Sequence, residues 1–562
     1  ATVVVSPKLF REFGETLSAA VLFGSNILFW RKSANYFDAP TDWNPLVHTW
    51  SLGVEEQFYI VFPLLLMVLW RLGARARMAL IAVAAIVSLA LSIWGTANAP
   101  TLTFYLLPTR AWELLIGALV ALHLMRVPAL EPASQTPRWA GLLVGIAGLA
   151  MIFWSLLRYD RTIAFPGAAA LLPCIGSALL LWVCRDTTNP VARVLSLAPL
   201  TFIGKISYSL YLWHWPLIVF ADRYLSYGAL TWHARIGIVA TAVFAAYASW
   251  RWVEQPFRAR PGAGARSWSR AKIFLAAGGG TAALALMGVV VLAGEGWPKR
   301  FPGIESVSIE RQKAMESQDS EWRKFDVKRC FMPNVSDWGG DACYLNRHPG
   351  AGSAILWGDS FAWAYAYGFY HNDGLKLGVL QYTSPQCPPI LGYHASSHPQ
   401  CDAFDRDIGP VVRKYNVSTV IMVANWTAYL RTRKIRYEDI AATVTTLRAR
   451  GLRVILIGQS PVFPFAYPDE YFFKKYPQGE PVQPQGEPVQ DYYAPLNADP
   501  NLNARILEAA HPDVFYDPLR SLCRVSECIF KQGDSYLVED YGHWTHDGSV
   551  LAVAKLMEAA NR

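Results

Sequence analysis

The sequence has few charged residues for its length. Of 562 residues, 17% are charged and 53% are hydrophobic, a low and a high share for a soluble protein. The apolar residues concentrate before residue 295, and the charges, prolines and tyrosines concentrate after it. A single soluble domain is therefore excluded, and a boundary is predicted near Gly294–Phe301. The net charge of +8 does not indicate nucleic acid, because many basic residues stand in short loops between apolar segments.

Cysteine is scarce in the first half of the chain. Only Cys174 and Cys184 precede residue 329, and we interpret both as packing residues of an apolar segment. The later six are Cys330, Cys343, Cys387, Cys401, Cys523 and Cys528. Their spacings are not those of a zinc site, so no metal site is predicted. An even set indicates an oxidising compartment and up to three disulfides. Pairing 330–343, 387–401 and 523–528 is the simplest of 15 connectivities.

Long apolar runs fill the first half. Nine segments are long enough, or nearly so, to span a membrane: 16–30, 57–70, 78–95, 105–125, 139–157, 166–184, 205–221, 235–252 and 273–294. Basic residues occur in alternate joining loops, beginning with Lys8 and Arg11 before the first segment. The positive-inside rule then places residues 1–15 in the cytoplasm. Nine crossings would put the C-terminal domain outside, in agreement with its cysteines.

The second half alternates between strand-like and helix-like stretches. Strands are predicted at 353–357, 375–380, 418–424 and 452–457, with helices at 403–415 and 437–450, which indicates a parallel α/β sheet. A tandem repeat within 466–494 predicts a surface loop. The predicted domains are a membrane domain (1–260), a cytoplasmic loop with the last transmembrane helix (261–300), a periplasmic linker (301–350) and an α/β domain (351–562).

A serine at a strand-to-helix turn is the first candidate for catalysis. The apolar run from Ser353 ends at Gly358-Asp359-Ser360, and a stretch with few helix breakers follows from Phe361 to Tyr370. Backbone amides and the helix dipole at such a turn favour developing negative charge, which suits a nucleophile. The alternative is an ordinary turn in which Asp or Ser caps the helix.

A base for this serine is available near the C-terminus. Asp540 and His543 are three residues apart, just before the last predicted helix, Ser549–Ala560. A nucleophilic serine needs a base, and the base needs a carboxylate that fixes its tautomer and orientation. His546, with Asp547 beside it, is the rival pair. The alternative is a surface loop that contains a histidine by chance.

Gly358-Asp359-Ser360 and Asp540-x-x-His543 together resemble the SGNH hydrolase superfamily. The resemblance implies a flavodoxin-like three-layer α/β fold, with Ser360 as nucleophile, His543 as base and Asp540 as its orienting partner. It also implies an oxyanion donor from a later asparagine, which Asn425 matches best. This chain reads Val-Ala-Asn-Trp there instead of Gly-x-Asn-Asp, and the segment 381–389, where a glycine donor is expected, contains no glycine.

Ionisable residues stand in or beside the apolar segments. They are His48, Glu55, Glu56, Arg110, Glu113, Lys205 and His214. Such groups are costly at membrane depth and usually face an internal site, so we predict one site or entrance for all seven. The alternatives are interfacial anchoring for Lys205 and a structural ion pair for Arg110 and Glu113, one turn apart.

Four motifs stand out in this half of the chain, and the first three carry all seven residues. They are Pro45-Leu-Val-His-Thr-Trp-Ser-Leu-Gly-Val-Glu-Glu-Gln-Phe-Tyr59, Arg110-Ala-Trp-Glu-Leu-Leu-Ile-Gly117, Gly204-Lys-Ile-Ser-Tyr-Ser-Leu-Tyr-Leu-Trp-His-Trp-Pro216 and Trp252-Val-Glu-Gln-Pro-Phe-Arg258. Together they resemble membrane acyltransferase family 3, the O-acetylases of bacterial surface polysaccharides, over about residues 1–260. Members of that family normally open with further helices that carry a conserved histidine. The chain starts at Ala1 without them, so we interpret it as an N-terminally truncated fragment.

The fused arrangement resembles the bacterial O-antigen acetylases. It implies a polytopic enzyme of the inner membrane that moves an acyl group from a cytoplasmic donor, acetyl-CoA, onto a sugar hydroxyl of a lipid-linked or surface polysaccharide, without a bound cofactor. One alternative is a membrane-anchored periplasmic esterase, although nine apolar segments are more than an anchor requires. Another is a transporter with a non-catalytic outer domain, which the paired serine and histidine motifs disfavour.

Overall fold

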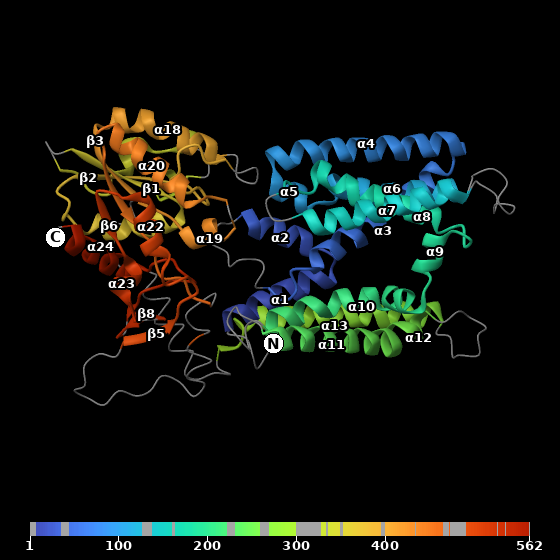
Figure 1. The fold of residues 1–562 in the computed structure, drawn as a ribbon. Coiled ribbons are helices and arrows are strands. Elements are labelled where there is room, and N and C mark those ends of the chain that lie inside the picture. The colour runs from blue at the N-terminus through green and yellow to red at the C-terminus, as the bar shows by residue number, and fades with distance from the viewer. Residues whose placement is uncertain are drawn as a thin grey trace. The chain divides into compact units, whose positions relative to one another are not determined.

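A computed structural model of the chain divides into two compact units, Ala1–Gly296 and Trp297–Arg562 (Figure 1). The division falls inside the boundary region predicted from composition. The structure describes residues 7–34, 44–125, 138–159, 163–221, 231–258, 269–298, 327–332, 335–348, 352–394, 400–432, 434–464, 471, 491–524, 526–533 and 535–560.

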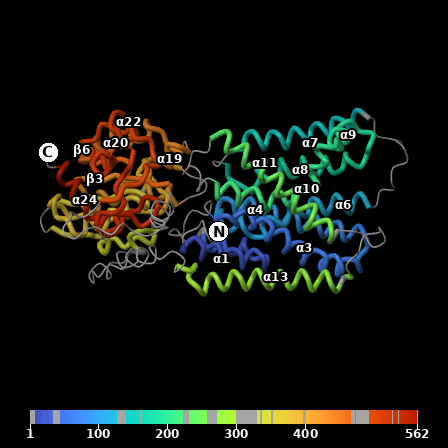
Figure 2. Tube along the Cα trace, turned by 90° about the horizontal axis from the view of Figure 1, so that it is seen from below, coloured from blue at the N-terminus to red at the C-terminus, as the bar shows by residue number. Residues whose placement is uncertain are grey.

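The first unit is built from helices. They are α1 (Pro7–Val21), α2 (Ser25–Ala34), α3 (Thr49–Leu69), α4 (Ala74–Asn98), α5 (Pro100–Tyr105), α6 (Leu107–Leu124), α7 (Arg138–Arg158), η2 (Gly167–Ala170), α8 (Leu171–Val183), α9 (Pro190–Leu195), α10 (Ala198–Ala221), α11 (Trp232–Ser249), η4 (Trp250–Glu254), α12 (Gln255–Arg258) and α13 (Arg270–Ala293). A helix satisfies its own backbone hydrogen bonds, as an apolar segment in a bilayer requires. Figures 1 and 2 show α1 beside α13 and α7 beside α8.

Six helices in the described ranges are long and apolar enough to cross a membrane. They are Thr49–Leu69, Ala74–Asn98, Pro100–Leu124, Trp139–Arg158, Trp232–Glu254 and Ala271–Ala293, and each contains one of the predicted segments or ends one residue before that segment ends. The segment 166–184 forms a shorter apolar helix, Gly167–Val183. The segment 205–221 lies within α10, which has 24 residues. The chain is therefore a multi-pass membrane protein.

The first predicted segment, 16–30, is not one helix. Helix α1 ends at Val21 and α2 begins at Ser25, and Phe23 between them has a φ of 57°. Ser25 Oγ donates to the Thr49 carbonyl at 2.8 Å. Asn26 Nδ2 donates to the Tyr105 carbonyl at 3.1 Å. Both polar side chains are fully buried, so the break lets them pair with other helices, which the apolar pattern alone could not indicate.

The amino end of α1 lies against the carboxyl end of α13. Arg11 Nε is 3.0 Å from Glu295 Oε2, and a Cβ on Gly296 would lie 1.9 Å from the Pro7 carbonyl oxygen. The two helices are thus antiparallel, with residues 7–11 beside residue 295. If the six long helices, Gly167–Val183 and α10 each cross once, eight crossings separate residue 7 from residue 295 in the described part of the chain, against the nine predicted. The number of crossings stays a prediction.

The second unit contains a five-stranded parallel sheet in the order β2-β1-β3-β4-β6. The strands are β1 (Ser353–Gly358), β2 (Gly378–Thr383), β3 (Val417–Val423), β4 (Arg453–Ile457) and β6 (Val514–Tyr516). Three of the four predicted strands are present within one residue. The strand predicted at 375–380 starts later, because Lys376, with a φ of 51°, closes a turn by donating its amide to the Asp373 carbonyl. Strand β6, only three residues long, was not predicted.

Helices cover both faces of this sheet (Figure 1). Ala354 and Leu356 of β1 pack with α17 (Ala366–Tyr370) and α24 (His546–Ala560). Ile355 and Trp357 face the other side, with α18 (Gln400–Lys414), α20 (Tyr437–Ala449) and α22 (Leu502–Ala510). Adjacent residues of a strand point to opposite faces, so a strand buried on both sides reads as a continuous apolar run. The second unit has the predicted three-layer α/β fold.

A second, antiparallel sheet was not predicted. It joins β5 (Asp491–Pro495), β8 (Glu527–Gln532) and β7 (Cys523–Arg524), with β9 (Ser535–Tyr536) on β8. Within the loop predicted at 466–494, the structure describes only Tyr471 and the start of β5. The tandem repeat lies outside the described residues.

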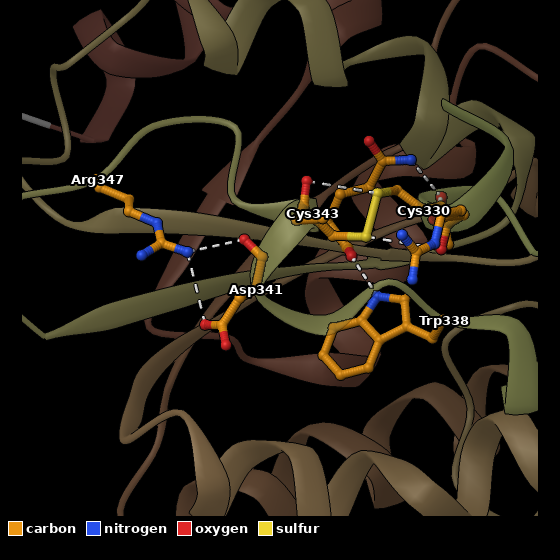
Figure 3. The surroundings of a disulfide bond; sticks show 9 residues. Cys330, Trp338, Asp341, Cys343 and Arg347 are labelled. Carbon is orange, nitrogen blue, oxygen red and sulfur yellow. Dashed lines mark hydrogen bonds and ion pairs between the residues drawn. A yellow bond between two sulfur atoms is a disulfide. The ribbon is translucent and has the colours of Figure 1, made fainter. Parts of the chain in front are cut away.

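The stretch before β1 packs on the edge of the parallel sheet. It contains α15 (Val327–Cys330), η7 (Val335–Asp337) and η8 (Gly340–Cys343). The Cys330–Cys343 disulfide is buried, and Trp338 Nε1 donates to the Gln381 carbonyl of β2 at 3.0 Å (Figure 3). Of residues 301–350, which we expected to be a linker, the described stretches 327–332 and 335–348 supply Cys330, Met332, Cys343 and Leu345 to the core of the second unit. Disulfides 387–401 and 523–528 are also present, so all three pairs match the simplest connectivity.

Candidate active site

A tight turn presents Ser360 at the carboxyl end of β1. Gly358 ends the strand with a φ of 156°, and a Cβ there would lie 1.8 Å from the Val423 carbonyl oxygen. Asp359 caps α16 (Ser360–Ala364): its Oδ1 accepts the Phe361 amide at 2.9 Å. Its Oδ2 accepts the Asn425 amide at 3.0 Å, which ties the turn to the end of β3. Asp359 is therefore the residue that caps the helix, as the alternative interpretation of this turn expected of Asp or Ser. The Ser360 side chain does not cap the helix and faces the C-terminal loop.

Ser360, His543 and Asp540 form a hydrogen-bonded chain. Ser360 Oγ is 2.8 Å from His543 Nε2, and His543 Nδ1 is 2.7 Å from Asp540 Oδ2. The other carboxylate oxygen of Asp540 accepts the amides of Gly542 and His543, both at 2.9 Å. Because a carboxylate only accepts, it holds the Nδ1 proton and leaves the Nε2 lone pair toward the serine. The arrangement can activate a hydroxyl for attack on an acyl carbon.

Burial and charge shift the pKa values of three residues at this site, His543, Asp540 and Asp359. Burial lowers the pKa of His543, but the charge and hydrogen bond of Asp540, with smaller effects of Glu539 and Asp359, raise it above its usual value overall. Burial alone would raise the pKa of Asp540, and its pairing with His543 lowers it instead. Burial raises the pKa of Asp359 to about 6, although hydrogen bonds from Asn425 and Phe361 act in the other direction.

His546 occupies a different place from His543. It begins α24, three residues earlier than predicted, and its ring stacks on Tyr367 with a centroid distance of 3.9 Å. The ring of His543 instead lies 4.9 Å from that of Phe361, beside Ser360. Asp547 is exposed in the first turn of α24. The loop thus brings one of the two candidate histidines to the serine.

Asn425 lies near the serine but has other partners. It caps α19 (Trp426–Arg431), with its Oδ1 accepting the Ala428 amide at 3.2 Å, and its side chain also bonds to Tyr541. In the segment 381–389, which lacks glycine, Gln386 adopts a left-handed φ of 59°. Sequence reasoning missed Tyr541 and Phe361, whose rings flank His543. Their only sequence signal is that each adjoins a residue of the triad motifs.

In the membrane unit, two of the candidate histidines lie together. His48 precedes α3 and is buried, and the centroids of its ring and the His214 ring are 5.6 Å apart. The ring of Tyr211 contacts both histidine rings, with centroid distances of 5.4 Å to His48 and 5.3 Å to His214. Its hydroxyl donates to the His48 carbonyl at 2.9 Å and is 2.6 Å from Ser51 Oγ. His214 Nδ1 is 2.7 Å from the Tyr211 carbonyl, which can only accept, so the proton of a neutral His214 is on Nδ1.

Arg110 and Glu113 form a two-pronged ion pair. Arg110 Nε and Nη2 donate to the two oxygens of Glu113 at 3.0 and 2.9 Å. The guanidinium also lies 4.9 Å from the ring centroid of Trp50, two residues after His48. Because Arg110 binds both carboxylate oxygens, the pair holds the guanidinium in a fixed orientation beside Trp50.

The remaining membrane candidates are more dispersed. Glu55 and Glu56 are partly exposed on α3, and Glu55 is close enough to Tyr211 to act on it electrostatically. Lys205 is exposed on α10, and no contact in the described structure ties it to the histidines. Sequence reasoning did not select Tyr211, Ser51 or Glu254. Glu254 accepts a hydrogen bond from Ser209 and ends a π-helical turn, a feature frequent at functional sites.

Two family models match the chain. An "Acyltransferase domain" matches residues 10–251, and an "SGNH domain (fused to AT3 domains)" matches residues 329–558. Together they cover most of the sequence. The chain belongs to the acyltransferase family whose members carry a fused SGNH domain. Within the described ranges, this acyltransferase–SGNH chain has no group of three His, Cys, Asp or Glu side chains placed to bind a metal ion.

The acyltransferase–SGNH chain is similar to named O-acetyltransferases. It is 28% identical over 263 residues to "O-acetyltransferase OatA" of Staphylococcus aureus (strain NCTC 8325 / PS 47), covering 46% of this chain and 43% of that protein. It is 28% identical over 271 residues to "Putative peptidoglycan O-acetyltransferase YrhL" of Bacillus subtilis (strain 168), covering 47% and 42%. The matched part spans less than half the length of either relative.

Among solved structures, the chain is similar to the "Salmonella ser. Paratyphi A lipopolysaccharide acetyltransferase periplasmic domain". The TM-score is 0.34 and the identity is 14%, over 44% of this chain and 100% of that one.

Proposed function

We propose that the chain is an O-acetyltransferase of the bacterial inner membrane. It moves an acetyl group from cytoplasmic acetyl-CoA onto a sugar hydroxyl of a cell-surface polysaccharide, such as the O-antigen of lipopolysaccharide. The observation that carries the proposal is the 2.8 Å contact between Ser360 Oγ and His543 Nε2, with Asp540 behind the histidine. The names of the relatives support acetyl as the group and a cell-envelope glycan as the acceptor. The three disulfides support a periplasmic site for the second unit.

The outer-domain reaction has two halves. Ser360 Oγ attacks the acyl carbon while its proton moves to His543 Nε2, the bond from the acyl group to its carrier breaks, and the carrier leaves with that proton. A sugar hydroxyl then attacks the acyl–Ser360 ester and gives its proton to His543. The bond to Ser360 Oγ breaks, and the serine regains the proton. Asn425 is proposed as an oxyanion donor through Nδ2, which carries two hydrogens, while its Oδ1 accepts the Ala428 amide.

The membrane unit is proposed to receive the acetyl group on the cytoplasmic side and pass it outward. His48, which is buried, and the half-buried His214 and Tyr211 bring two imidazoles and a phenol into one cluster, and we propose that protons move among them. With its proton on Nδ1, a neutral His214 presents the Nε2 lone pair as a base. Arg110 and Glu113 shape the cluster from the Trp50 side. Glu55→Gln or His214→Ala should therefore stop donor use while the chain still inserts and folds.

Hydrolysis is the competing reaction, because the same triad could pass an acyl group to water. A transfer enzyme must exclude water from the acyl–serine or let the sugar hydroxyl outcompete it. Proteoliposomes holding the full chain, with labelled acetyl-CoA and polysaccharide, separate the functions. We expect label in the polysaccharide, its loss in Ser360→Ala, and normal labelling in Ser336→Ala, an exposed serine in η7. Release of existing acetyl esters without labelling would establish an esterase, and neither reaction would leave a transporter.

A further inference from the structure

The second unit has a pocket that the proposed chemistry does not use. Its volume is about 780 Å³, inside the range of ~300–1,000 Å³ typical of small-molecule sites. It lies among α19, the start of α20, the segment 496–499 and α22. We call it the arginine pocket, because Arg431, Arg436 and Arg505 all line it.

The arginine pocket adjoins the residues that hold the triad. One wall is α19, which contains Thr427 and begins after Asn425, the residue whose amide binds the Asp359 carboxylate. The other wall includes Asn497, whose amide donates to the Val462 carbonyl at 2.7 Å. The next residue, Phe463, donates to the carbonyl of Tyr541. Helix α19 follows β3, and Asn497 is bonded to the loop that follows β4, so both walls lie at the same carboxyl edge as Ser360, where ligands of open α/β sheets bind.

Three arginines and two acidic residues, Glu438 and Asp499, line the pocket, so the lining has a net positive charge that favours an anion. Arg505 pairs with Asp499, and Arg436 pairs with Asp439 at 3.3 Å. Arg431 is exposed, and it has no ion-pair partner within the described part of the chain. A guanidinium fork binds a carboxylate or phosphate through two parallel hydrogen bonds. The ring of Tyr437, which Arg505 faces at 5.6 Å, adds the apolar contact that one face of a sugar ring can use.

We propose that the arginine pocket binds an acidic sugar of the acceptor, one that carries a carboxylate or a phosphate. Arg431 holds the anionic group, and another sugar unit of the same glycan reaches Ser360. The pocket is therefore a specificity subsite for polyanionic glycans. This inference rests on the proposed transferase function, because it assigns the class of glycan that the outer domain accepts.

The test measures binding by calorimetry on the full chain in detergent. The probes are three tetrasaccharides of one backbone, in which one unit is glucuronic acid, 6-phosphoglucose or neutral glucose. We expect at least one acidic probe to bind roughly 10-fold tighter than the neutral one, and the tighter acidic probe identifies the anion. Arg431→Gln should remove this preference, and Arg431→Lys should keep part of it. The matched control is Arg450→Gln, an exposed arginine that ends α20 at the opposite edge of the sheet.

Equal binding of the three probes would overturn the inference. So would a preference unchanged in Arg431→Gln, or lost equally in Arg450→Gln. Binding is measured again in Ser360→Ala, and the preference should remain, because the binding measurement does not depend on catalysis. If labelled transfer fails, the proposed function is contradicted, and the binding preference still stands. Conversely, normal transfer with no anion preference would contradict the subsite alone.

Discussion

Two histidines three residues apart have different surroundings, and only His543 contacts Ser360. His543→Ala removes the base, so polysaccharide acetylation should fall by roughly 10³-fold or more. His546 packs on Tyr367, so His546→Ala should lower the rate by less than about tenfold, through small packing changes. The measurement is initial rate of label transfer, with melting temperatures as the control for folding. A severe defect in His546→Ala beside a near-normal His543→Ala would reverse the assignment.

The protonation of His543 should appear in the pH profile. The base works only when neutral, and Asp540 raises the pKa of His543 above 6.5 despite burial. Transfer should therefore increase with pH and reach half its maximum above pH 6.5, measured as kcat/KM of the full chain. In Asp540→Asn the raising charge is gone, so the midpoint should move to lower pH while the maximal rate falls. A midpoint below pH 6.5 in the unaltered chain would contradict this account.

Among single residues, the family resemblance of two motifs was enough to select the residues that meet. Ser360 and His543 are 183 positions apart, and a sheet with β1 in its interior and the last loop at its carboxyl edge joins them. The alternation of strands and helices predicts such a sheet. Spacing could not reveal Tyr541 or Phe361 as neighbours of His543, because ring contacts depend on how the loop closes. Nor could it show that Asn425 would be engaged as a helix cap.

Among the elements, the end of β1 depends on one glycine. A methyl group at Gly358 would lie 1.8 Å from the Val423 carbonyl oxygen, inside the β1–β3 pairing. Gly358→Ala should therefore lower the free energy of unfolding by more than ~4 kcal/mol, or prevent folding. Gly392→Ala is the control, since Gly392 also has a positive φ, 77°, but nothing within 4 Å. It should cost only about 1 kcal/mol in the same thermal melts. Equal costs would show that backbone strain, not the steric clash, explains Gly358.

The disulfide before β1 should contribute measurably to stability. It closes 13 residues and fixes α15 and η8 on β2. Cys330→Ala with Cys343→Ala should cost about 3 kcal/mol by loop-closure entropy. Removing the pair Cys523 and Cys528, which closes only 5 residues, should cost roughly 1 kcal/mol less. Melting of the second unit under non-reducing conditions measures both. Six alkylatable late thiols in unreduced protein, or a reversed order of losses, would contradict this prediction.

Elements were predictable where one periodicity ran for several residues. The central strands are buried on both faces, so they read as apolar runs bounded by breakers. Strand β6 has three residues, and β7 and β9 have two each, too short to show any pattern. Their pairing depends on the fold around them. The break between α1 and α2 was missed for a related reason, because it is stabilised by Asn26 and Ser25 reaching distant helices.

For the whole molecule, composition was sufficient to predict where the chain divides into two units. It was not sufficient to predict how many times the first unit crosses the membrane. Apolar runs locate spanning segments, since each must be long enough to cross. They do not say whether a short pair such as α1 and α2 crosses or returns. Contacts bear on that question: the Arg11–Glu295 pair favours a return of α1 and α2 to the side on which α1 begins. One miscounted segment changes the parity, and parity decides which side each end occupies.

Eight crossings would put residue 7 and the second unit on the same side of the membrane, and the disulfides favour the oxidising side, so we predict both outside the cytoplasm. A periplasm-active phosphatase fused at Arg562 should therefore be active, and a reporter that works only in the cytoplasm should be silent there. Lys8→Cys, with Cys174 and Cys184 replaced by serine, should react with an impermeant maleimide added outside intact cells. The control is a cysteine in place of Arg75, at the start of α4 after one crossing, which should react only after permeabilisation. An active phosphatase with a protected Lys8→Cys would restore nine crossings, because α1 and α2 would then have to span the bilayer together.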